Sequence, residues 1–176
     1  MKALKYLFSL LLCLTIFFIS ACDKLDHDPE MKWLNKTKAL IEHNSEKISI
    51  GQGIAATVLF TEGNCMPTVW PASNNCRTYP VRRVVHIYEY TLHTQTNHAG
   101  GGFHTKVNSK RIAKITSDIE GFFEISLVPG KYSIFVEENN MLYANGWDGQ
   151  GGVQSIEVTA GEVSFKQIPI TYKAYY

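Results

Sequence analysis

Three histidines, His93, His98 and His104, lie in or beside the glycine-rich stretch 94–102. Imidazole nitrogen is a common ligand of zinc and copper, so a cluster of this kind could form a metal site. The spacing argues against one, because no two of the three are separated by a single residue and no acidic residue lies among them. The sequence therefore predicts no metal and no other cofactor, and these three residues are the candidates if a metal is bound. His86 is interpreted as an ordinary residue of a sheet.

The stretch Trp147-Asp148-Gly149-Gln150-Gly151-Gly152 holds a single acidic residue. A calcium-binding loop alternates several oxygen ligands, so one Asp among glycines favours a turn instead. Sequence signatures of catalysis are also lacking, since the chain has neither a Gly-x-Ser-x-Gly elbow nor a phosphate-binding glycine loop. We therefore expect a protein that is not an enzyme.

Cys65 and Cys76 are the two cysteines outside the N-terminal region, in a stretch rich in Pro, Asn and Ser. In an exported protein we expect them to form a disulfide, which would contribute about 2–3 kcal/mol by closing a short loop. The alternative is half of a zinc site, which the ten-residue gap and the lack of Cys-x-x-Cys pairs disfavour.

Six aromatic residues fall in predicted loops or near a terminus, where exposed rings can contact a carbohydrate or a protein. Trp70, Tyr143 and Trp147 are the candidates for ligand contact. The alternative for each ring is that it seals an end of the domain and is buried. The other three are Tyr79, Tyr175 and Tyr176.

The elements that must hold these residues begin with an N-terminal segment. Lys2 and Lys5 precede an apolar run that ends in Ile19-Ser20-Ala21-Cys22. This arrangement resembles a bacterial lipoprotein signal peptide, in which lipid is added to the cysteine thiol and the chain is cut just before it. The resemblance implies removal of residues 1–21 and a membrane anchor, diacylglycerol with palmitate, on Cys22. The alternative is a transmembrane helix, but Tyr6 to Ala21 is 16 residues, short of the roughly 20 needed to span a bilayer.

Composition and charge bound the class of protein. Removal of residues 1–21 leaves 155 residues, enough for one domain with a hydrophobic core. The remaining chain carries 15 basic and 16 acidic side chains, so charge gives no reason to expect nucleic acid as a partner.

The acid-rich segment 23–30 resembles the surface-export signals of Bacteroidetes lipoproteins. In enterobacteria, by contrast, an Asp directly after the lipidated cysteine is associated with retention in the inner membrane. We expect a lipid-anchored protein of the cell envelope, on the periplasmic or surface face of the outer membrane rather than on the inner membrane.

Residues 22–47 are expected to form an acidic tether followed by a short amphipathic helix that starts near Pro29. The apolar stripe of this helix is expected to pack on the main domain. The alternative is an interfacial helix that touches lipid through Trp33. The residues of the stripe are Met31, Leu34 and Ile41.

From residue 48 onward the pattern is one of short β-branched and aromatic strands separated by turns. Val153–Val158 and Val163–Tyr172 are expected to form a closing hairpin, and 94–102 a flexible polar loop. The prediction is an all-β sandwich of seven or eight strands. Its inward positions include Phe123, Ile125, Leu127, Tyr132, Ile134 and Val136.

The stretch Thr116-Ser117-Asp118-Ile119-Glu120-Gly121-Phe122-Phe123, followed by Val128-Pro129-Gly130-Lys131-Tyr132, resembles the carboxypeptidase regulatory-like (transthyretin-like) domain. That family shows an acidic turn, a glycine, an inward aromatic residue and then Pro-Gly-x-Tyr. Here Asp118 would close the turn, and Gly121 would adopt positive φ. The resemblance covers about residues 50–173 and implies a transthyretin-like (prealbumin-like) sandwich without peptidase activity. Hydroxyisourate hydrolases of this fold end in Tyr-Arg-Gly-Ser, whereas this chain ends in Lys173-Ala174-Tyr175-Tyr176.

The sequence thus predicts a signal peptide over 1–21, a tether and helix over 22–47, and a β-sandwich over 48–176. The expected function is non-catalytic binding or scaffolding, with the membrane as one partner and a protein or glycan of the envelope as another. The alternatives are a metal- or glycan-binding lipoprotein that uses the loop histidines and aromatics and, less favoured, a transthyretin-like hydrolase.

Overall fold

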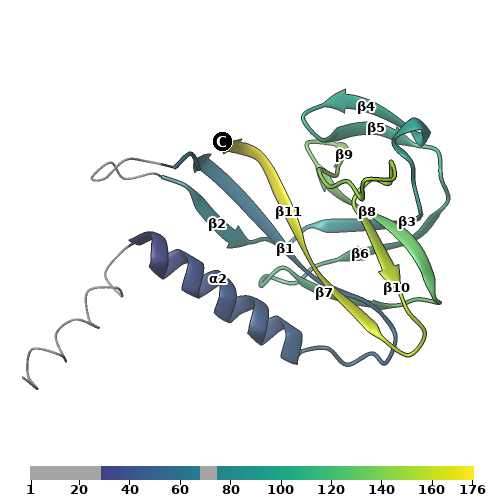
Figure 1. Ribbon diagram of the computed structural model, residues 1–176, viewed down its shortest axis with the longest axis horizontal. Helices are drawn as coiled ribbons and strands as arrows, with labels where there is room; N and C mark the ends of the chain where they lie inside the picture. Colours follow the sequence, from purple (N-terminus) through teal and green to yellow (C-terminus); the bar gives the residue numbers. More distant parts are fainter. Residues whose placement is uncertain (1–28, 68–74) are drawn as a thin grey trace, which may run out of the picture. The chain divides into compact units, whose positions relative to one another are not determined.

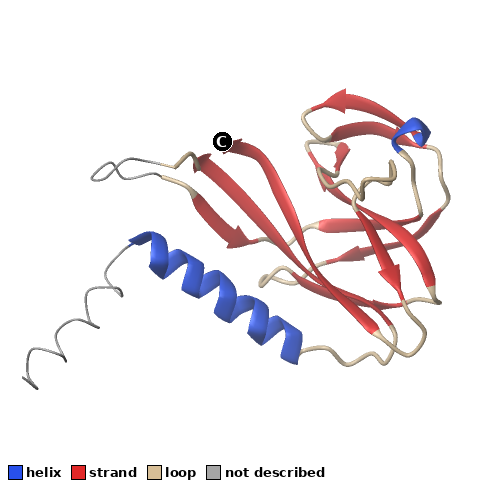
Figure 2. Cartoon of the chain, in the orientation of Figure 1, coloured by secondary structure: helices blue, strands red, loops and turns tan. Residues whose placement is uncertain are grey.

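The computed structural model describes residues 29–67 and 75–176, with side chains from residue 36 onward (Figure 1). The chain divides into two compact units, residues 1–39 and residues 40–176. The larger unit contains two β-sheets (Figure 2). Within the described residues, no helix combines the length and apolar character needed to cross a membrane. The predictions for the signal peptide, Cys22 and Trp70 concern residues outside the described ones.

Helix α2 (Pro29–Glu46) confirms the predicted helix, and its final turn is tied to the sheets of the larger unit. The Asn44 side chain is fully buried, and its amide nitrogen donates to the Thr57 hydroxyl and to the Glu120 carbonyl, each at 3.0 Å. Just beyond the helix, the Lys47 ammonium pairs with the carboxylates of Asp118 and Glu120. These contacts fix where the chain enters its first strand.

The first sheet is built around β1, which pairs with three other strands. It pairs with β11 in parallel and, on its other side, antiparallel with β7 along residues 53–57 and with β2 along residues 59–62. The nine residues from Gly53 to Thr61 are all buried, because both faces of β1 are covered: alternate residues such as Ile54 and Val58 lie in the main core, and Thr57 meets Asn44 of α2. The bounds are β1 (Gly53–Asn64), β2 (Arg77–Pro80), β7 (Phe122–Ser126) and β11 (Val163–Tyr175).

The second sheet has the strand order β4-β5-β9-β8-β3-β6, and β10 pairs with the first part of β8. All its pairings are antiparallel. In Figure 1, β4, β5 and β9 lie together at one end of the domain. The bounds are β3 (Val84–Glu89), β4 (Thr96–Gly100), β5 (Phe103–Val107), β6 (Arg111–Thr116), β8 (Gly130–Glu138), β9 (Met141–Tyr143) and β10 (Ser155–Val158).

The main core contains the inward side chains of both sheets, so the all-β sandwich is confirmed. Phe123, Tyr132, Ile134 and Val136 are buried there, as their alternation predicted, and Ile125 and Leu127 pack against the cluster half-buried. The described residues form eleven strands rather than seven or eight. The predicted number was too low because β2, β4 and β9 are short and lie within stretches read as loops.

The predicted closing hairpin is wrong. β10 pairs with β8 in the second sheet, whereas β11 pairs in parallel with β1 in the first sheet. The turn between them therefore carries the chain from one sheet to the other. Alternation within each strand was visible in the sequence, but the partner of a strand is decided by contacts far along the chain.

The predicted flexible loop 94–102 is also wrong, because most of it is regular. A short 3-10 helix, η1 (His93–Gln95), leads into β4, which pairs with β5. The turn at its tip has positive φ at Gly100, Gly101 and Gly102, a conformation that glycine adopts without steric cost. The glycines therefore serve a tight hairpin turn.

The turn between β6 and β7 matches the prediction made for Asp118 and Gly121. The Asp118 carboxylate accepts from the backbone N–H groups of Glu120 and Phe122, each at 2.9 Å. Gly121 has φ of 73°, and a Cβ built on it would lie 2.3 Å from the Val58 carbonyl oxygen. Only a residue without a side chain can bring this turn so close to β1.

A second, smaller core lies on the outer face of β8. Ile134 and Val136 face the main core, so Phe135 between them points to the opposite side of the sheet, where it is fully buried. Tyr88 and Val153 pack in the same outer cluster. β8 is therefore covered on both faces, and this second layer supports the residues described next. Ala144 is also buried there, with Val107 and Leu142 partly buried against the cluster.

Candidate functional site

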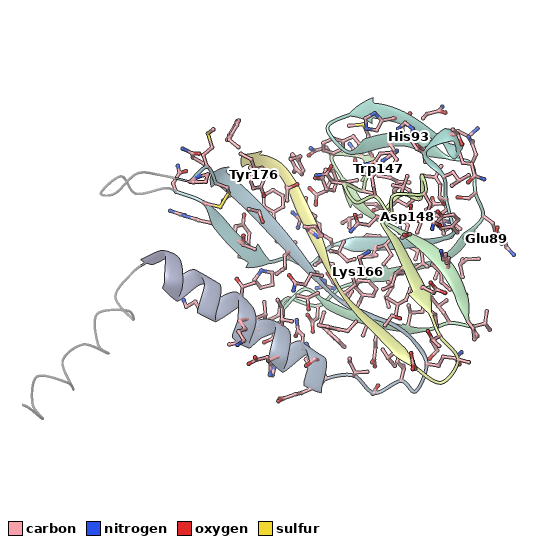
Figure 3. The ribbon with its side chains drawn as sticks, viewed as in Figure 1. Glu89, His93, Trp147, Asp148, Lys166 and Tyr176 are labelled. Atoms are coloured by element: carbon pink, nitrogen blue, oxygen red, sulfur yellow. A yellow bond between two sulfur atoms is a disulfide. The ribbon has the colours of Figure 1, made fainter. Side chains whose placement is uncertain are left out.

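Four rings form a row that runs from the second core to the surface: His104, His98, His93 and Trp147, hereafter the His–Trp cluster. Ring centroids are 5.2 Å apart between His104 and His98, 5.4 Å between His98 and His93, and 4.8 Å between His93 and Trp147. Figure 3 shows His93 and Trp147 close together near the β4–β5 hairpin. The structure thus joins two groups of residues that the sequence had suggested for separate reasons.

His104 is the buried end of the row. It is 1% exposed, and its ring meets Phe135 edge-on at 5.3 Å. Burial lowers the pKa of His104; a hydrogen bond with the Ala144 backbone opposes this shift, and the nearby His98 and His93 add to it. Its Nδ1 atom is buried without a hydrogen-bond partner. His104 therefore stays neutral at physiological pH and acts as part of the second core.

His98 and His93 carry the row outward. His98 lies directly opposite His104 in the β4–β5 ladder and is exposed, and its Nδ1 accepts from the Gly100 backbone N–H at 3.2 Å. His93 lies in η1, and its backbone N–H donates to the Gly151 carbonyl at 2.9 Å. The hydrogen bond to Gly151 connects η1, at the start of the β4–β5 hairpin, to the loop that carries Trp147.

Trp147 is the exposed end of the row, with 56% of its surface accessible. An exposed tryptophan ring offers a large apolar area with a polar edge to a binding partner. The residue forms an isolated bridge with Val153, and the neighbouring Leu92 bridges Gly152. The ring is therefore presented by a braced loop.

Asp148 organises that loop and confirms the turn predicted there. One carboxylate oxygen accepts from the backbone N–H groups of Gln150 and Gly152, each at 2.8 Å. The other accepts from the Tyr90 hydroxyl at 2.7 Å and from the Ser155 hydroxyl at 3.2 Å. The Tyr90 bond, with the others, holds the pKa of Asp148 well below its usual range. The carboxylate therefore remains ionised and keeps the loop ordered over the whole neutral and mildly acidic range.

The three histidines named as metal candidates are successive members of the row. In the parts of the chain that the structure describes, no group of three or more His, Cys, Asp or Glu side chains is placed to hold a metal ion. Their rings instead contact one another in sequence along the row. We therefore treat the cluster as a surface for contact with another molecule.

The other predicted site residues have different outcomes. Cys65 and Cys76 form the predicted disulfide, with Cα atoms 4.8 Å apart. The interpretation of Tyr143 as an exposed loop residue is wrong: it lies in β9, is 1% exposed, and its hydroxyl is 3.0 Å from the Thr171 hydroxyl. The rings of Phe103 and Tyr172 cover it at 5.2 and 5.6 Å. Tyr143 is thus a core residue that cannot contact a ligand directly.

A depression of about 580 Å³ on the second sheet is a feature that the sequence did not reveal. His86 and Glu137 line it, with the His86 Nε2 atom 2.6 Å from a Glu137 carboxylate oxygen that also accepts from Lys114 at 2.8 Å. Burial lowers the pKa of His86, which the Glu137 contact partly offsets. Glu137 is shared between His86 and Lys114, so we interpret the His86–Glu137 pair as a structural polar contact within the sheet. This agrees with the interpretation of His86 as an ordinary residue of a sheet.

The organising role of Tyr90 and Asp148 was also missed. These residues are 58 positions apart, and the bridge between Leu92 and Gly152 brings their segments together. The glycines on both sides of Asp148 were the sequence signal that could have indicated this tightly packed loop. Gly152 has no room for a side chain, since a Cβ there would lie 2.4 Å from the Asp148 carboxylate and 2.4 Å from the Tyr90 ring.

Comparison with known proteins adds no relative. No model of a known protein family, no curated protein and no solved structure matches the chain. The functional argument therefore rests on the residues and their geometry.

Proposed function

We propose that this protein is a lipid-anchored, non-catalytic binding protein of the cell envelope, and that it binds through the His–Trp cluster. The anchor would be diacylglycerol and palmitate on Cys22, placed on the outer membrane. The observation that carries the binding proposal is the exposed Trp147, held in place by a carboxylate that makes four hydrogen bonds.

The anchoring proposal rests on the sequence before and after Cys22. The basic start, the apolar run of limited length and the small residues before the cysteine favour lipoprotein processing over a membrane span. The Cys65–Cys76 disulfide is consistent with export, because disulfides persist in oxidising compartments.

We also propose that the sandwich is of the carboxypeptidase regulatory-like, transthyretin-like kind. The geometry of Asp118 and Gly121 supports this assignment, since the motif performs the turn expected of it. Tyr132 supports it too: its ring lies in the core, and its hydroxyl donates to the Val128 carbonyl at 2.8 Å across the Pro129-Gly130 turn.

The binding proposal follows from how Trp147 is presented. A tryptophan ring supplies a large contact area, and a ring already fixed loses little conformational entropy on binding. In this protein the Asp148 carboxylate holds the loop by accepting from its backbone, and the His93 ring lies 4.8 Å from the Trp147 ring, centroid to centroid. These are features of a preformed contact surface.

Metabolic labelling with palmitate tests the anchor. The wild type is expected to be labelled and to fractionate with membranes, whereas Cys22→Ser is expected to lose the label. Cys13→Ser is the matched control, because it removes the other cysteine of the N-terminal region and should still be labelled. Labelled Cys22→Ser protein would refute the anchor.

Capture from solubilised envelope fractions tests the binding surface. Full-length protein in detergent is used as bait, in wild-type form and as Trp147→Ala. Material retained by the wild type and lost from Trp147→Ala supports the proposal. Equal recovery by both baits would show that Trp147 is not part of a binding surface.

A further inference from the structure

Two segments that meet at the His–Trp cluster are almost free of charge. Residues 90–105 contain no Asp, Glu, Lys or Arg, and residues 143–154 contain only Asp148. Since 19% of the chain is charged, about five such side chains would be expected among these 28 residues. The one carboxylate present is already occupied by the hydrogen bonds to the loop. We call this surface the uncharged face.

The two segments form one continuous surface. The Val153 N–H donates to the Thr91 carbonyl, the His93 N–H to the Gly151 carbonyl and the Ala144 N–H to the Gly102 carbonyl, each at 2.9 Å. The two segments carry exposed hydroxyl, amide and imidazole groups, and the His93 ring lies 4.8 Å from the Trp147 ring, centroid to centroid. The exposed polar residues of the two segments include Thr94, Gln95, Asn97, His98, Asn145 and Gln150.

We infer that the uncharged face binds a neutral oligosaccharide, with a sugar ring stacked on Trp147. This inference names the ligand class of the surface in the proposed function and rests on that proposal. A sugar has an apolar C–H face that packs on an aromatic ring, and hydroxyl groups around its edge that need hydrogen-bond partners. Uncharged amides and hydroxyls supply these bonds at a lower desolvation cost than charged groups do.

Other ligand classes fit this surface less well. An anionic glycan would need basic groups near the ring, but two nearby basic side chains are engaged elsewhere: Lys131 lies 5.7 Å from the centre of the Tyr90 ring, and the Lys166 ammonium donates to the Ser155 carbonyl. Lys106, which is exposed and lies opposite Asn97 in the β4–β5 ladder, is the basic side chain that the anionic set of the test would probe. A stable protein interface buries about 800 Å² on each partner around an apolar centre. Within the two segments, which are fully described, the exposed large hydrophobic side chains are Leu92, 37% exposed, and Trp147.

The test is binding of full-length protein in detergent to a panel of neutral oligosaccharides, with uronate-containing and sulfated oligosaccharides as the anionic set. The wild type is expected to bind members of the neutral set. Trp147→Ala should weaken that binding roughly tenfold or more, as loss of a central aromatic contact does. Tyr176→Ala is the matched control, because Tyr176 is 73% exposed and lies outside both segments, and it should bind as the wild type does.

Salt dependence separates neutral from ionic recognition. Binding to the neutral set should be unchanged between about 0.05 and 0.5 M NaCl, because screening acts on charge pairs. Binding confined to the anionic set, or neutral binding that Trp147→Ala leaves intact, would overturn the inference. Failure of the whole panel, while envelope capture still depends on Trp147, would overturn the sugar ligand and leave the proposed function standing.

Discussion

Replacing Gly121 by alanine tests the turn on which the sandwich assignment depends. Gly121 has φ of 73°, and a new Cβ would lie 2.3 Å from the Val58 carbonyl oxygen and 3.1 Å from the Val58 nitrogen. The backbone conformation alone costs an L-residue about 1–2 kcal/mol, partly offset by the lower entropy of the unfolded chain with alanine. The clash adds a separate term, because the turn or β1 has to move by about 1 Å to restore ordinary contact.

A shift of the turn away from β1 would also weaken a backbone hydrogen bond between the two. The Val58 N–H donates to the Gly121 carbonyl at 2.8 Å, and an unpaired buried N–H costs about 1–3 kcal/mol. Together with the strain, we expect Gly121→Ala to lower the free energy of unfolding by about 4 kcal/mol. This would be a large part of the 5–15 kcal/mol that is usual for a domain.

Gly161→Ala is the matched control. Gly161 has φ of 75°, nearly the same as Gly121, but a Cβ there meets nothing within 4 Å. Gly161→Ala should therefore lower the free energy of unfolding only through conformational strain, by about 1 kcal/mol once the lower entropy of the unfolded chain is subtracted. Urea unfolding of residues 23–176, followed by circular dichroism, measures both values. Equal losses in the two variants would refute the close approach of this turn to β1.

Three further predictions address the disulfide, the buried histidine and the Trp147 loop. Replacing both Cys65 and Cys76 by serine should lower the free energy of unfolding by about 3 kcal/mol, the value for a loop of this length, and urea unfolding at one pH checks it. Because burial lowers the pKa of His104 in the folded state, the unfolded chain takes up a proton first as the pH falls below about 6.5, so stability falls from pH 7 to pH 5. His104→Phe should reduce that loss, and an unchanged pH dependence of unfolding would contradict it. Asp148→Ala should free Trp147, seen as a drop in tryptophan fluorescence anisotropy in a chain whose Trp33 and Trp70 are replaced by phenylalanine; unchanged anisotropy would show that the four hydrogen bonds do not hold the ring.

Local signals in the sequence predicted the parts of the fold that depend on neighbours in the chain. The alternation of Tyr132, Ile134 and Val136 marked the inward face of β8, and an acidic residue before Gly121 marked a tight turn. The two cysteines outside the N-terminal region, together with the expectation that the protein is exported, predicted the disulfide. The first two of these inferences needed only a few adjacent residues.

The parts that could not be predicted depend on contacts between distant segments. Tyr143 lies between the polar pair Asn139-Asn140 and the turn signal Asn145-Gly146 and so resembles a loop residue. The rings of Phe103 from β5 and Tyr172 from β11 nevertheless bury it. His104 is buried for the same kind of reason, since Phe135 covers it from β8. Alternation along one strand cannot show that both faces of a sheet are covered.

The sequence suggested residues of the candidate site but did not indicate that they lie together. The sequence singled out His93, His98 and Trp147, because aromatic and imidazole side chains stand out in turn-rich segments. Their convergence was not foreseeable, since His93 and Trp147 are brought together by backbone pairing of the 91–93 and 151–153 segments. Because of that pairing, the histidines and the tryptophan that the sequence had suggested separately lie on one surface.

Photo-crosslinking in living cells tests the central claim most directly. Benzoylphenylalanine replaces either Trp147 or Tyr176 in the full-length protein, both of which are exposed, and illumination attaches whatever lies against the ring. We expect a discrete adduct, glycan or protein, from position 147 in the envelope fraction and none from position 176. An adduct from position 176 with none from position 147 would contradict the claim that this protein binds its partner through the His–Trp cluster.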